Sequence, residues 1–289
     1  MVSKRPISKI KTRPFHERVR FYGEALNLSK RGLNGTQIAR ELERRFGARL
    51  DPGQVRLWVL GKASPYGRVH CLELRQIPEL AYVIGVKLGD GSLSRNWHHN
   101  YMVKLRVSDK EFAEEFARCV SVVLRCRPIK VWWYAERKLW AAEPSSMLLS
   151  GFLGSMLDRF KPFVEHCGLC ASAFLRGIFD SEGSVGKDDL RLSNTNSYLL
   201  SYVQDLLDNK YAIETTGPYL AGPRPGTVQF IRGRLAHVNK QCYDIRVRPR
   251  CYARFSDSIG FTIGRKKKSL TSLVNQKQNR RAARSDCGR

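Results

Sequence analysis

Apolar residues gather along the chain in two short stretches that resemble each other. Residues 81–93 and residues 173–185 each form an apolar run that ends in an acid, a glycine, a serine and a further apolar residue. When the two runs are aligned, Asp90 matches Glu182. A repeat within one chain sets its architecture, so the pattern predicts two copies of one structural unit.

Each run predicts a helix that ends close to its acid. Pro78 suits a first helical turn, and Ser172 is a good N-cap for the second run. Gly91 and Gly183 stand where a helix C-terminus favours a residue that tolerates a left-handed conformation. The sequence therefore predicts that both acids lie at the C-terminal ends of two helices.

Small residues mark one face of each expected helix. Gly85 stands four residues before Gly89, and Gly177 stands four residues before Ser181. This spacing places both small residues of a helix on one face. A face without large side chains lets two helix backbones approach closely. Packing on these faces would carry the two acids to the same end of the helix pair.

That end of the pair is unfavourable for carboxylates. Each helix C-terminus carries roughly half a negative charge, and two carboxylates ~4 Å apart repel by about 4 kcal/mol at an effective dielectric constant near 20. Asp90 and Glu182 therefore need a cation, and oxygen ligands select a hard divalent ion such as Mg²⁺. In the alternative interpretation each acid only follows a core helix, but the occurrence of two matching motifs weakens it.

Alternating apolar and basic residues predict strands after each motif. Residues 101–107 and 242–248 place apolar side chains on one face and basic side chains on the other. This pattern is typical of a half-buried antiparallel strand, and a basic outer face suits DNA grooves and phosphates. An ordinary solvated face is the alternative. The outward basic residues are Lys104, Arg106, Arg246 and Arg248.

Further elements complete each repeat. Residues 109–125 and 198–207 predict helices beneath the sheets, and residues 145–160 predict one closing helix. Residues 227–240 form a basic insertion that we expect to touch DNA, whereas the basic tail from residue 276 is expected to be loosely ordered. Strands are expected at residues 128–134, 137–142, 184–187, 190–194 and 214–220. Further candidate DNA contacts are Lys130, Arg137, Lys138, Lys187, Arg191, Arg232 and Arg234.

The N-terminal part predicts three short helices after a basic arm. They are expected at residues 18–30, at residues 37–46 with Thr36 as the cap, and from Asp51 onward. Such a group resembles a helix-turn-helix module, whose third helix would be the recognition helix. A plain three-helix packing unit is the alternative. The third helix is expected to bury Val55, Leu57, Trp58 and Leu60 and to present Gln54 and Arg56 to DNA.

Composition agrees with an anionic partner. The 289 residues carry a net charge of +25, which favours a polyanion or a negatively charged surface. The longest apolar runs fall short of the ~18 residues of a membrane span, and the basic N-terminus lacks the apolar core of a signal peptide. We therefore expect an intracellular protein.

The eight cysteines are scattered. Cys167 and Cys170 are the one CxxC pair, and His166 adjoins them. A structural zinc site usually requires four ligands from two such pairs, and a second pair is lacking, so the pattern does not favour zinc. A disulfide stays open as an alternative.

The paired motifs resemble those of the LAGLIDADG homing endonucleases, in the monomeric, intron-encoded form with two motifs. The nine signature positions fall on residues 83–91 and 175–183, where the glycines and the penultimate acid match. The resemblance covers roughly residues 78–275. It implies an α+β fold with a pseudo-twofold αββαββα repeat, to which a small all-α domain is added at the N-terminus. The expected domains are residues 1–75, 76–170 and 171–289.

The same resemblance implies an activity. It is cleavage of both DNA strands at a long, non-palindromic site, leaving short 3′ overhangs, with Mg²⁺ as cofactor and Mn²⁺ as its substitute. The penultimate acids would bind metal together with the preceding carbonyls of Gly89 and Ser181. A basic residue near the scissile phosphates would be Lys161, with Lys266 as its pseudo-symmetric mate.

Some alternatives remain on the same fold. One is a maturase that binds intron RNA, and another is a helix-turn-helix DNA-binding regulator with a degenerate nuclease domain. Intact acids in both motifs argue against degeneracy.

Overall fold

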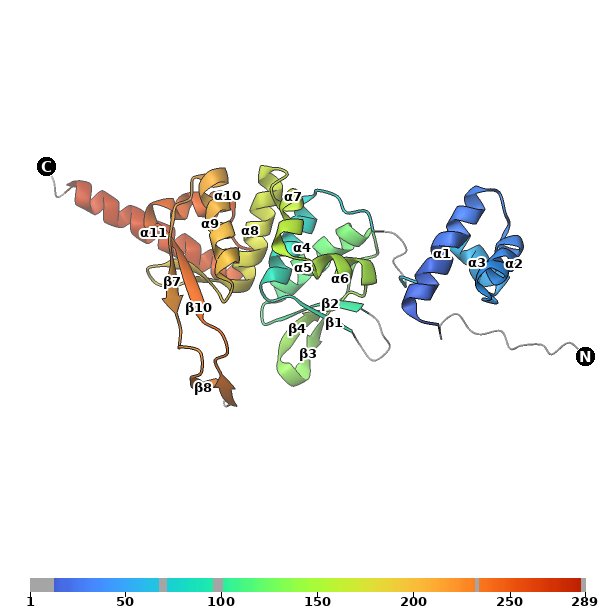
Figure 1. Cartoon of the computed structure of the whole chain (residues 1–289). Coiled ribbons are helices and arrows are strands. Elements are labelled where there is room, and N and C mark those ends of the chain that lie inside the picture. The colour runs from blue at the N-terminus through green and yellow to red at the C-terminus, as the bar shows by residue number, and fades with distance from the viewer. Residues whose placement is uncertain (1–12, 68–71, 96–100, 232–233, 287–289) are drawn as a thin grey trace, which may run out of the picture. The chain divides into compact units, whose positions relative to one another are not determined.

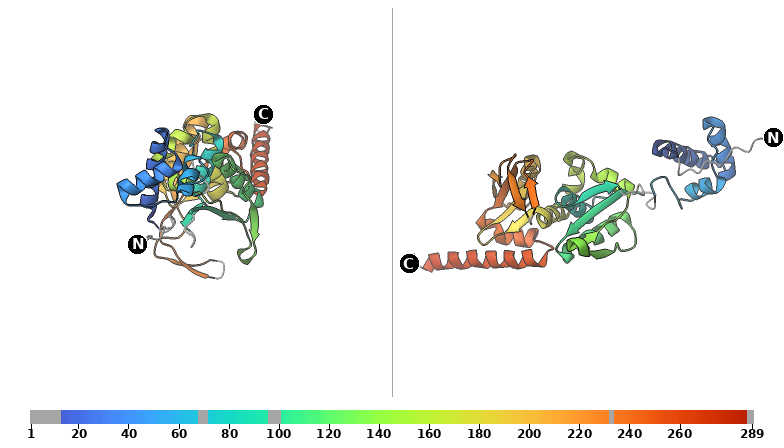
Figure 2. Two further views of the ribbon diagram at one scale, coloured as in Figure 1. Left: turned by 90° about the vertical axis from the view of Figure 1, so that its right-hand side faces the viewer. Right: turned by 90° about the horizontal axis from the view of Figure 1, so that it is seen from below.

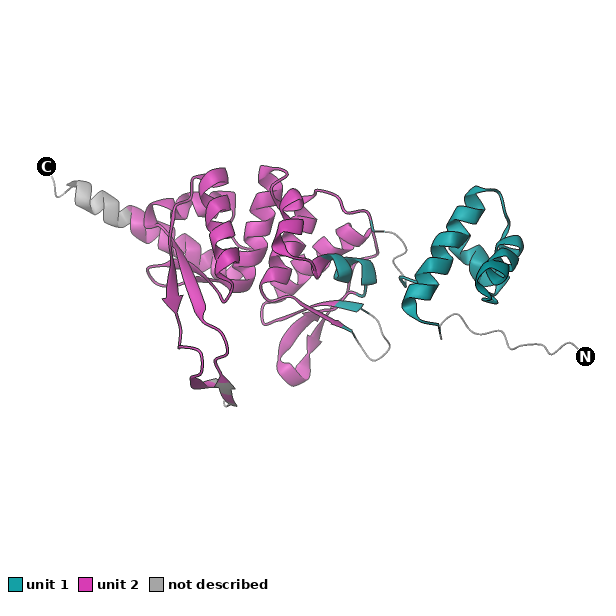
Figure 3. Cartoon of the chain, viewed as in Figure 1, with its two compact units in different colours: residues 1–72, 95–102, 145–152 teal, residues 73–94, 103–144, 153–289 magenta. Residues whose placement is uncertain are grey.

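The computed structural model describes residues 13–67, 72–95, 101–231 and 234–286. The backbone divides into two compact units, shown in Figure 3. Unit 1 contains residues 1–72, 95–102 and 145–152, and unit 2 contains the remainder. The expected division of the chain into three domains stays a prediction.

The N-terminal part of unit 1 consists of three helices around a small core. They are α1 (Phe15–Lys30), α2 (Gly35–Phe46) and α3 (Pro52–Val59), drawn in blue in Figure 1. Each contributes apolar side chains to one cluster, because one face of each amphipathic helix is buried. That cluster contains Phe21, Ala25, Leu28, Ile38, Ala39, Leu42, Ala48, Leu50, Val55 and Trp58.

Two details of these helices differ from the expectation. The N-cap of α2 is Asn34, whose side chain accepts hydrogen bonds from the backbone N–H groups of Thr36 and Gln37, so Thr36 is not the cap. Leu57 and Leu60 are 41% and 52% exposed rather than buried. A helix of eight residues buries one face, and these two leucines fall on the other.

The rest of the chain follows one element order twice. The first copy runs through α4 (Pro78–Leu88), β1 (Ser92–Arg95), β2 (Tyr101–Val107), α5 (Lys110–Leu124), β3 (Val131–Tyr134), β4 (Leu139–Ala142) and α6 (Met147–Leu153). The second runs through α8 (Gly168–Glu182), β5 (Gly183–Val185), β6 (Leu190–Asn194), α9 (Ser197–Tyr211), β7 (Thr215–Ala221), β10 (Cys242–Val247) and α10 (Tyr252–Ser258). The predicted α+β fold with a repeated αββαββα order is confirmed.

The two sheets have equivalent strand orders. One is β1-β2-β4-β3 and the other is β5-β6-β10-β7. Helix α5 packs on β3 and β4, and α9 packs on β6, β7 and β10. Each sheet therefore has one helix-covered face. On the opposite face of the second sheet, Arg246 pairs in register with Arg191.

The remaining elements connect or extend the repeats. They are α7 (Lys161–Val164), the hairpin of β8 (Val228–Ile231) and β9 (Arg234–His237), α11 (Gly264–Asp286), and the short 3₁₀ turns η2 (Ala135–Arg137), η3 (Leu157–Arg159) and η4 (Pro249–Cys251). Within the described residues, no helix is both long enough and apolar enough to cross a membrane.

Two expectations about these connecting segments are wrong. Residues 145–160 do not form one helix, because α6 ends at Leu153, where Gly154 and Ser155 disfavour helix, and η3 follows. The tail is not irregular, because α11 continues to Asp286 as one helix (Figure 2). The glutamine, arginine and alanine residues of that segment are good helix formers.

The core of unit 2 is the pair of motif helices, α4 and α8. They lie against each other along their small-residue faces. A methyl group added at Gly85 would lie 2.3 Å from the backbone oxygen of Phe174, and one at Gly177 would lie 2.5 Å from that of Tyr82. Such distances leave no room for a side chain, so both glycines are required for this backbone approach.

The glycines that follow the motif helices are required by close packing and not by a left-handed backbone conformation. Gly183 has φ −76° and ψ 144°, and Gly91 also lacks a positive φ, so the expected left-handed conformation is wrong. A methyl group at Gly91 would instead lie 2.7 Å from the Cα of Lys87, and one at Gly183 would lie 2.4 Å from the carbonyl oxygen of Phe179.

Candidate functional site

The two motif acids lie where α4 and α8 end together. Asp90 follows α4 after Gly89, and Glu182 is the last residue of α8. A methyl group at Gly89 would lie 2.4 Å from the Cβ of Ser181 and 3.1 Å from the Cγ of Glu182. The packing of the two helices therefore brings both acids, and the carbonyl groups that precede them, to one place.

The electrostatics of this place favour a bound cation. Burial, and then the negative charge of Asp90, raise the pKa of Glu182 to about 7. Burial also raises the pKa of Asp90, although solvent reaches this residue, because surrounding protein atoms limit the hydration of its carboxylate. The positive charge of Lys266 lowers both pKa values but does not restore them. The carboxylates of Asp90 and Glu182 therefore share one site in which the nearby positive charge does not balance their negative charge.

A pocket of about 600 Å³ opens beside the acids. Its wall includes Asp90, Ser181, Lys266, Arg137 and Lys138. The two last residues come from the turn between β3 and β4 and are exposed. The pocket therefore combines one motif acid with exposed positive charges, which is the composition that a phosphate group and its counter-ion require.

Lys266 lies at the C-terminal end of α8. It is 6% exposed, and its Nζ donates hydrogen bonds to the backbone oxygens of Phe179, at 3.0 Å, and Asp180, at 2.6 Å. These carbonyl groups belong to the last turn of α8, where a cation is favourable. Burial lowers the pKa of Lys266 to about 8, and the neighbouring acids act in the opposite direction.

Lys161 lies at the opposite end of α8 from the two acids, and its expected role near the scissile phosphates stays a prediction. Its Nζ contacts the carboxylate of Asp158 at 2.7 Å and the hydroxyl group of Tyr198 at 3.2 Å. It also lies over the ring of Tyr202. Lys161 is the first residue of α7, which precedes the N-terminal end of α8, whereas both acids lie at the C-terminal end of α8. The Asp158 carboxylate raises the pKa of Lys161, which fixes its charge there.

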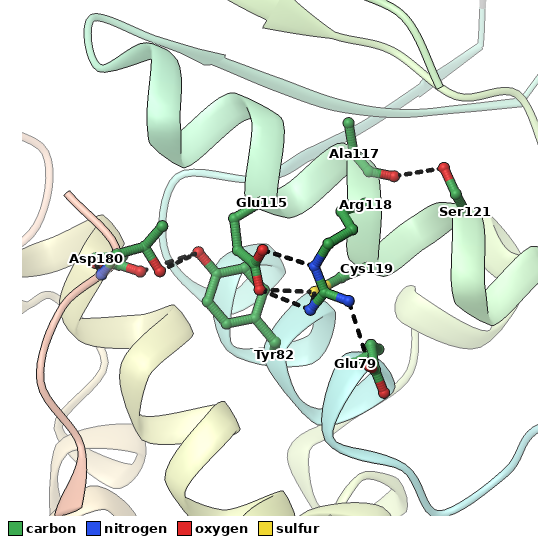
Figure 4. Close-up of polar contacts among 9 residues, drawn as sticks. Glu79, Tyr82, Glu115, Ala117, Arg118, Cys119, Ser121 and Asp180 are labelled. Atoms are coloured by element: carbon green, nitrogen blue, oxygen red, sulfur yellow. Dashed lines mark hydrogen bonds and ion pairs between the residues drawn. The ribbon is translucent and has the colours of Figure 1, made fainter. Parts of the chain in front are cut away.

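Asp180 is a functional candidate that the sequence reasoning missed. It is 1% exposed, accepts a hydrogen bond from the Tyr82 hydroxyl group at 2.9 Å, and accepts another from the backbone N–H of Thr262 at 2.8 Å. Figure 4 shows Tyr82 pointing to Asp180. The available signal was the sixth motif position, which is aspartate in the second motif and Leu88 in the first.

Arg265 is a second residue that was missed. Its guanidinium group binds both carboxylate oxygens of Asp109 at 2.8 Å, and this contact lowers the pKa of Asp109. Arg265 lines the pocket beside Asp90 and also a smaller one, of about 330 Å³, beside Ser184. Its place in the run Arg-Lys-Lys-Lys was the available signal.

The candidate DNA contacts of the first sheet lie on β2 and around the β3–β4 turn. Arg106 is exposed, pairs with Glu143 and lies 5.0 Å from the ring of Tyr134, while Lys104 is half-buried. Lys130 is exposed just before β3. Arg137 and Lys138 are the two members of this set that border the acid pocket.

In the second sheet Arg191 and Arg246 stand side by side. The Arg191 Nε donates to the hydroxyl group of Ser184 at 3.0 Å, and the Arg246 guanidinium group lies over the ring of Tyr219. Lys187 is exposed in the β5–β6 turn. Arg248 is paired with Glu214 at 3.4 Å. These residues together make a basic surface.

The other candidates lie apart from these sheets. Gln54 and Arg56 are on α3 of unit 1, where Arg56 is exposed. Arg234 begins β9. Arg232 lies outside the described residues.

One family model and two relatives match parts of this chain. The model of the LAGLIDADG-like domain matches residues 170–260, which include the second motif. An uncharacterised protein of Methanocaldococcus jannaschii is 27% identical over 254 residues, which cover 86% of this chain and 90% of that protein. Another uncharacterised protein of the same organism is 26% identical over 157 residues, covering 52% of this chain and 56% of its own length.

Solved structures with a similar arrangement also occur. The structure of I-DmoI in complex with DNA and Mn aligns with a TM-score of 0.46 at 18% identity, covering 64% of this chain and 98% of that chain. The homing endonuclease I-WcaI bound to its DNA recognition sequence aligns with a TM-score of 0.40 at 14% identity, covering 69% and 88% of the two chains.

Proposed function

We propose that the chain is a metal-dependent DNA endonuclease of the LAGLIDADG type, which cuts both strands at one long, asymmetric site; the match of residues 170–260 to the LAGLIDADG-like domain supports this. The observation that carries the proposal is the junction of Asp90 and Glu182 at the paired ends of α4 and α8. The sequence relatives carry no assigned activity, so the proposal rests on this site.

The residues present fit a hard divalent cation. Burial, and then the negative charge of Asp90, raise the pKa of Glu182, so the two carboxylates lack a counter-charge that a divalent ion would supply. The Asp90 and Glu182 carboxylates, with the carbonyl oxygens of Gly89 and Ser181, would hold Mg²⁺ or Mn²⁺ through oxygen atoms alone. The ion supplies activation of water and charge neutralisation at the phosphate during phosphodiester hydrolysis.

The chain's own cations have separate tasks in this proposal. Lys266 is held against the last turn of α8, so its charge is fixed beside the acids. Arg137 and Lys138 border the same pocket on an exposed turn and would bind the phosphate backbone. Arg246 and Arg191 would contact DNA along the second sheet.

The asymmetry of the two halves supports a non-palindromic target. One motif ends in Asp90 and the other in Glu182, and the β8–β9 hairpin occurs in the second repeat. We propose short 3′ overhangs as the product, one chain as the active form, and α3 as an added DNA contact through Gln54 and Arg56. Each of these follows from the family resemblance or the placement of charge.

The test is cleavage of a library of random duplex sites with Mg²⁺ or Mn²⁺. The wild-type chain should cut one long site on both strands. Asp90→Asn and Glu182→Gln should bind that site and leave it intact, whereas Asp205→Asn, on the exposed side of α9, should cut normally. Wild-type binding without cutting would contradict the proposal and favour the DNA-binding regulator. Preferential binding of structured RNA would favour the maturase.

A further inference from the structure

A cluster of three potential metal ligands lies at the start of α8. We propose that His166, Cys167 and Cys170 bind a zinc ion there. One nitrogen or sulfur atom from each of the three side chains lies within 4.8 Å of the other two. In a tetrahedral zinc site the neighbouring ligand atoms stand about 3.5–3.8 Å apart, so adjustments of about 1 Å would close the three side chains around the ion.

The local backbone directs the ligands to one place. Cys167 is the N-cap of α8, and its Sγ accepts a hydrogen bond from the backbone N–H of Cys170 at 3.4 Å. The spacing of a CxxC pair across a helix start therefore brings both sulfur atoms to the same end of the helix. His166 immediately precedes the cap and supplies the third ligand.

The ligand chemistry selects zinc rather than the ion proposed for the motif acids. Two sulfurs and an imidazole are typical zinc ligands, whereas Mg²⁺ prefers oxygen. Three protein ligands leave a fourth position for water.

The site lies where three helices meet. Helix α8 contacts both α7 and α9. The hydroxyl group of Tyr211, at the end of α9, donates to the backbone oxygen of Gly168 in the first turn of α8. Cys170 is fully buried, whereas His166 is exposed. A zinc ion here would tie the α7–α8 turn to the helix that carries Glu182, about 20 Å away along α8.

The same two cysteines are also able to form a disulfide, and the experiment must separate the two chemistries. All six described cysteines have free thiols, at positions 119, 126, 167, 170, 242 and 251. Oxidation of the pair would remove both thiolates as ligands. Zinc binding should therefore require reducing conditions during loading.

The experiment uses the full-length chain without a histidine tag. It is reduced, mixed with ZnSO₄, desalted, and analysed for zinc by atomic emission. We expect about one zinc ion per chain, and Co²⁺ in its place should give a thiolate-to-cobalt charge-transfer absorption. His166→Ala and Cys167→Ser should lose the ion, whereas Cys126→Ser, at an exposed cysteine, should retain it.

Folding of the variants is checked by circular dichroism. His166 is exposed, so His166→Ala should keep the wild-type spectrum while losing zinc. A zinc-selective chelator should lower the melting temperature of the wild-type chain and leave that of Cys167→Ser unchanged. A reduced wild-type chain that retains no zinc would overturn the proposal. Equal zinc retention by Cys167→Ser and Cys126→Ser would overturn it as well.

Discussion

The hydroxyl group of Tyr82, on the first motif helix, donates a hydrogen bond to Oδ2 of Asp180, on the second motif helix, over 2.9 Å. Both residues are buried, and Asp180 also accepts a hydrogen bond from the backbone N–H of Thr262, just before α11. One carboxylate thus joins the two motif helices to the segment that leads to Lys266. The Asp180 carboxylate therefore fixes the positions of α4, α8 and the segment before α11 relative to one another.

Replacement of Tyr82 by phenylalanine removes this cross-helix hydrogen bond and leaves its buried acceptor with one partner fewer. Tyr82→Phe should lower the free energy of unfolding by about 1.5–3 kcal/mol, as for hydrogen bonds to charged groups. Urea denaturation measures the change. Tyr198→Phe is the matched control, because Tyr198 is exposed and its loss should cost less than about 1 kcal/mol. Equal effects of the two variants would contradict the role given to Tyr82.

Replacement of Gly85 by alanine places a methyl group 2.3 Å from the backbone oxygen of Phe174. Backbone atoms cannot yield as a flexible side chain does, so α4 and α8 must separate. Gly85→Ala should destabilise the chain by about 3 kcal/mol, at the upper end for overpacked cores, and should reduce cleavage.

Gly23 offers the matched control for this glycine substitution. It lies within α1 with no atom within 4 Å of an added methyl group. Because alanine favours helix over glycine, Gly23→Ala should stabilise by about 0.5–1 kcal/mol. Thermal denaturation of both variants tests the difference in sign.

The raised pKa of Glu182 makes the stability of the metal-free chain dependent on pH. The pKa is about 7 in the folded chain and 4.5 as its ordinary value, so between these pH values the folded state binds the extra proton. The stability from this group is complete below pH 4.5 and is lost as the pH rises to about 7.

Glu182→Gln should remove this dependence. Without metal it should melt at a higher temperature than the wild-type chain at pH 8, and the difference should shrink toward pH 4.5. Divalent metal should raise the melting temperature of the wild-type chain at pH 8 and leave that of the variant nearly unchanged. A variant that melts below the metal-free wild-type chain at pH 8 would refute the electrostatic account.

Lys266 should contribute its charge to cleavage below about pH 8. Its pKa is lowered to about 8 by burial, so the ammonium group is present at neutral pH and is lost at higher pH. Lys266→Met should lower the cleavage rate about 10²–10³-fold, as for the loss of one fixed electrostatic group. Lys267→Met, at the exposed neighbour, should leave the rate unchanged. Single-turnover kinetics measure the cleavage rates of the two variants, and equal rates for Lys266→Met and Lys267→Met would contradict a role of Lys266 in cleavage.

Binding of DNA by the sheets should be dominated by salt-sensitive contacts. Arg246→Gln should weaken binding and lower the slope of log affinity against log salt concentration by about one phosphate contact. Lys210→Gln, at the end of the helix that covers the opposite face, should have no such effect. Fluorescence anisotropy at several salt concentrations tests the pair. A slope for Arg246→Gln equal to that of wild type would place DNA elsewhere.

Much of the architecture followed from local patterns in the sequence. The paired motifs predicted two helices with acids at their ends, and alternation predicted β2 and β10 at nearly their observed limits. These predictions succeed because periodicity and small-residue spacing are properties of residues that are close in the sequence. The chemical class of the acid site was visible for the same reason, since Asp90 and Glu182 repeat within one pattern.

Tertiary contacts decided the remainder. Whether Lys161 or Lys266 joins the acids depended on helix packing, and Lys161 is instead held by Asp158. Asp180 becomes important through partners 98 and 82 residues away, and such distant pairings leave no local signal. His166 became a candidate ligand only because the turn before α8 brings its ring close to the two sulfur atoms. The sequence alone thus predicted the repeat and its acids, whereas only the three-dimensional packing of the chain decided which cation lies beside the acids and which side chains gather at the start of α8.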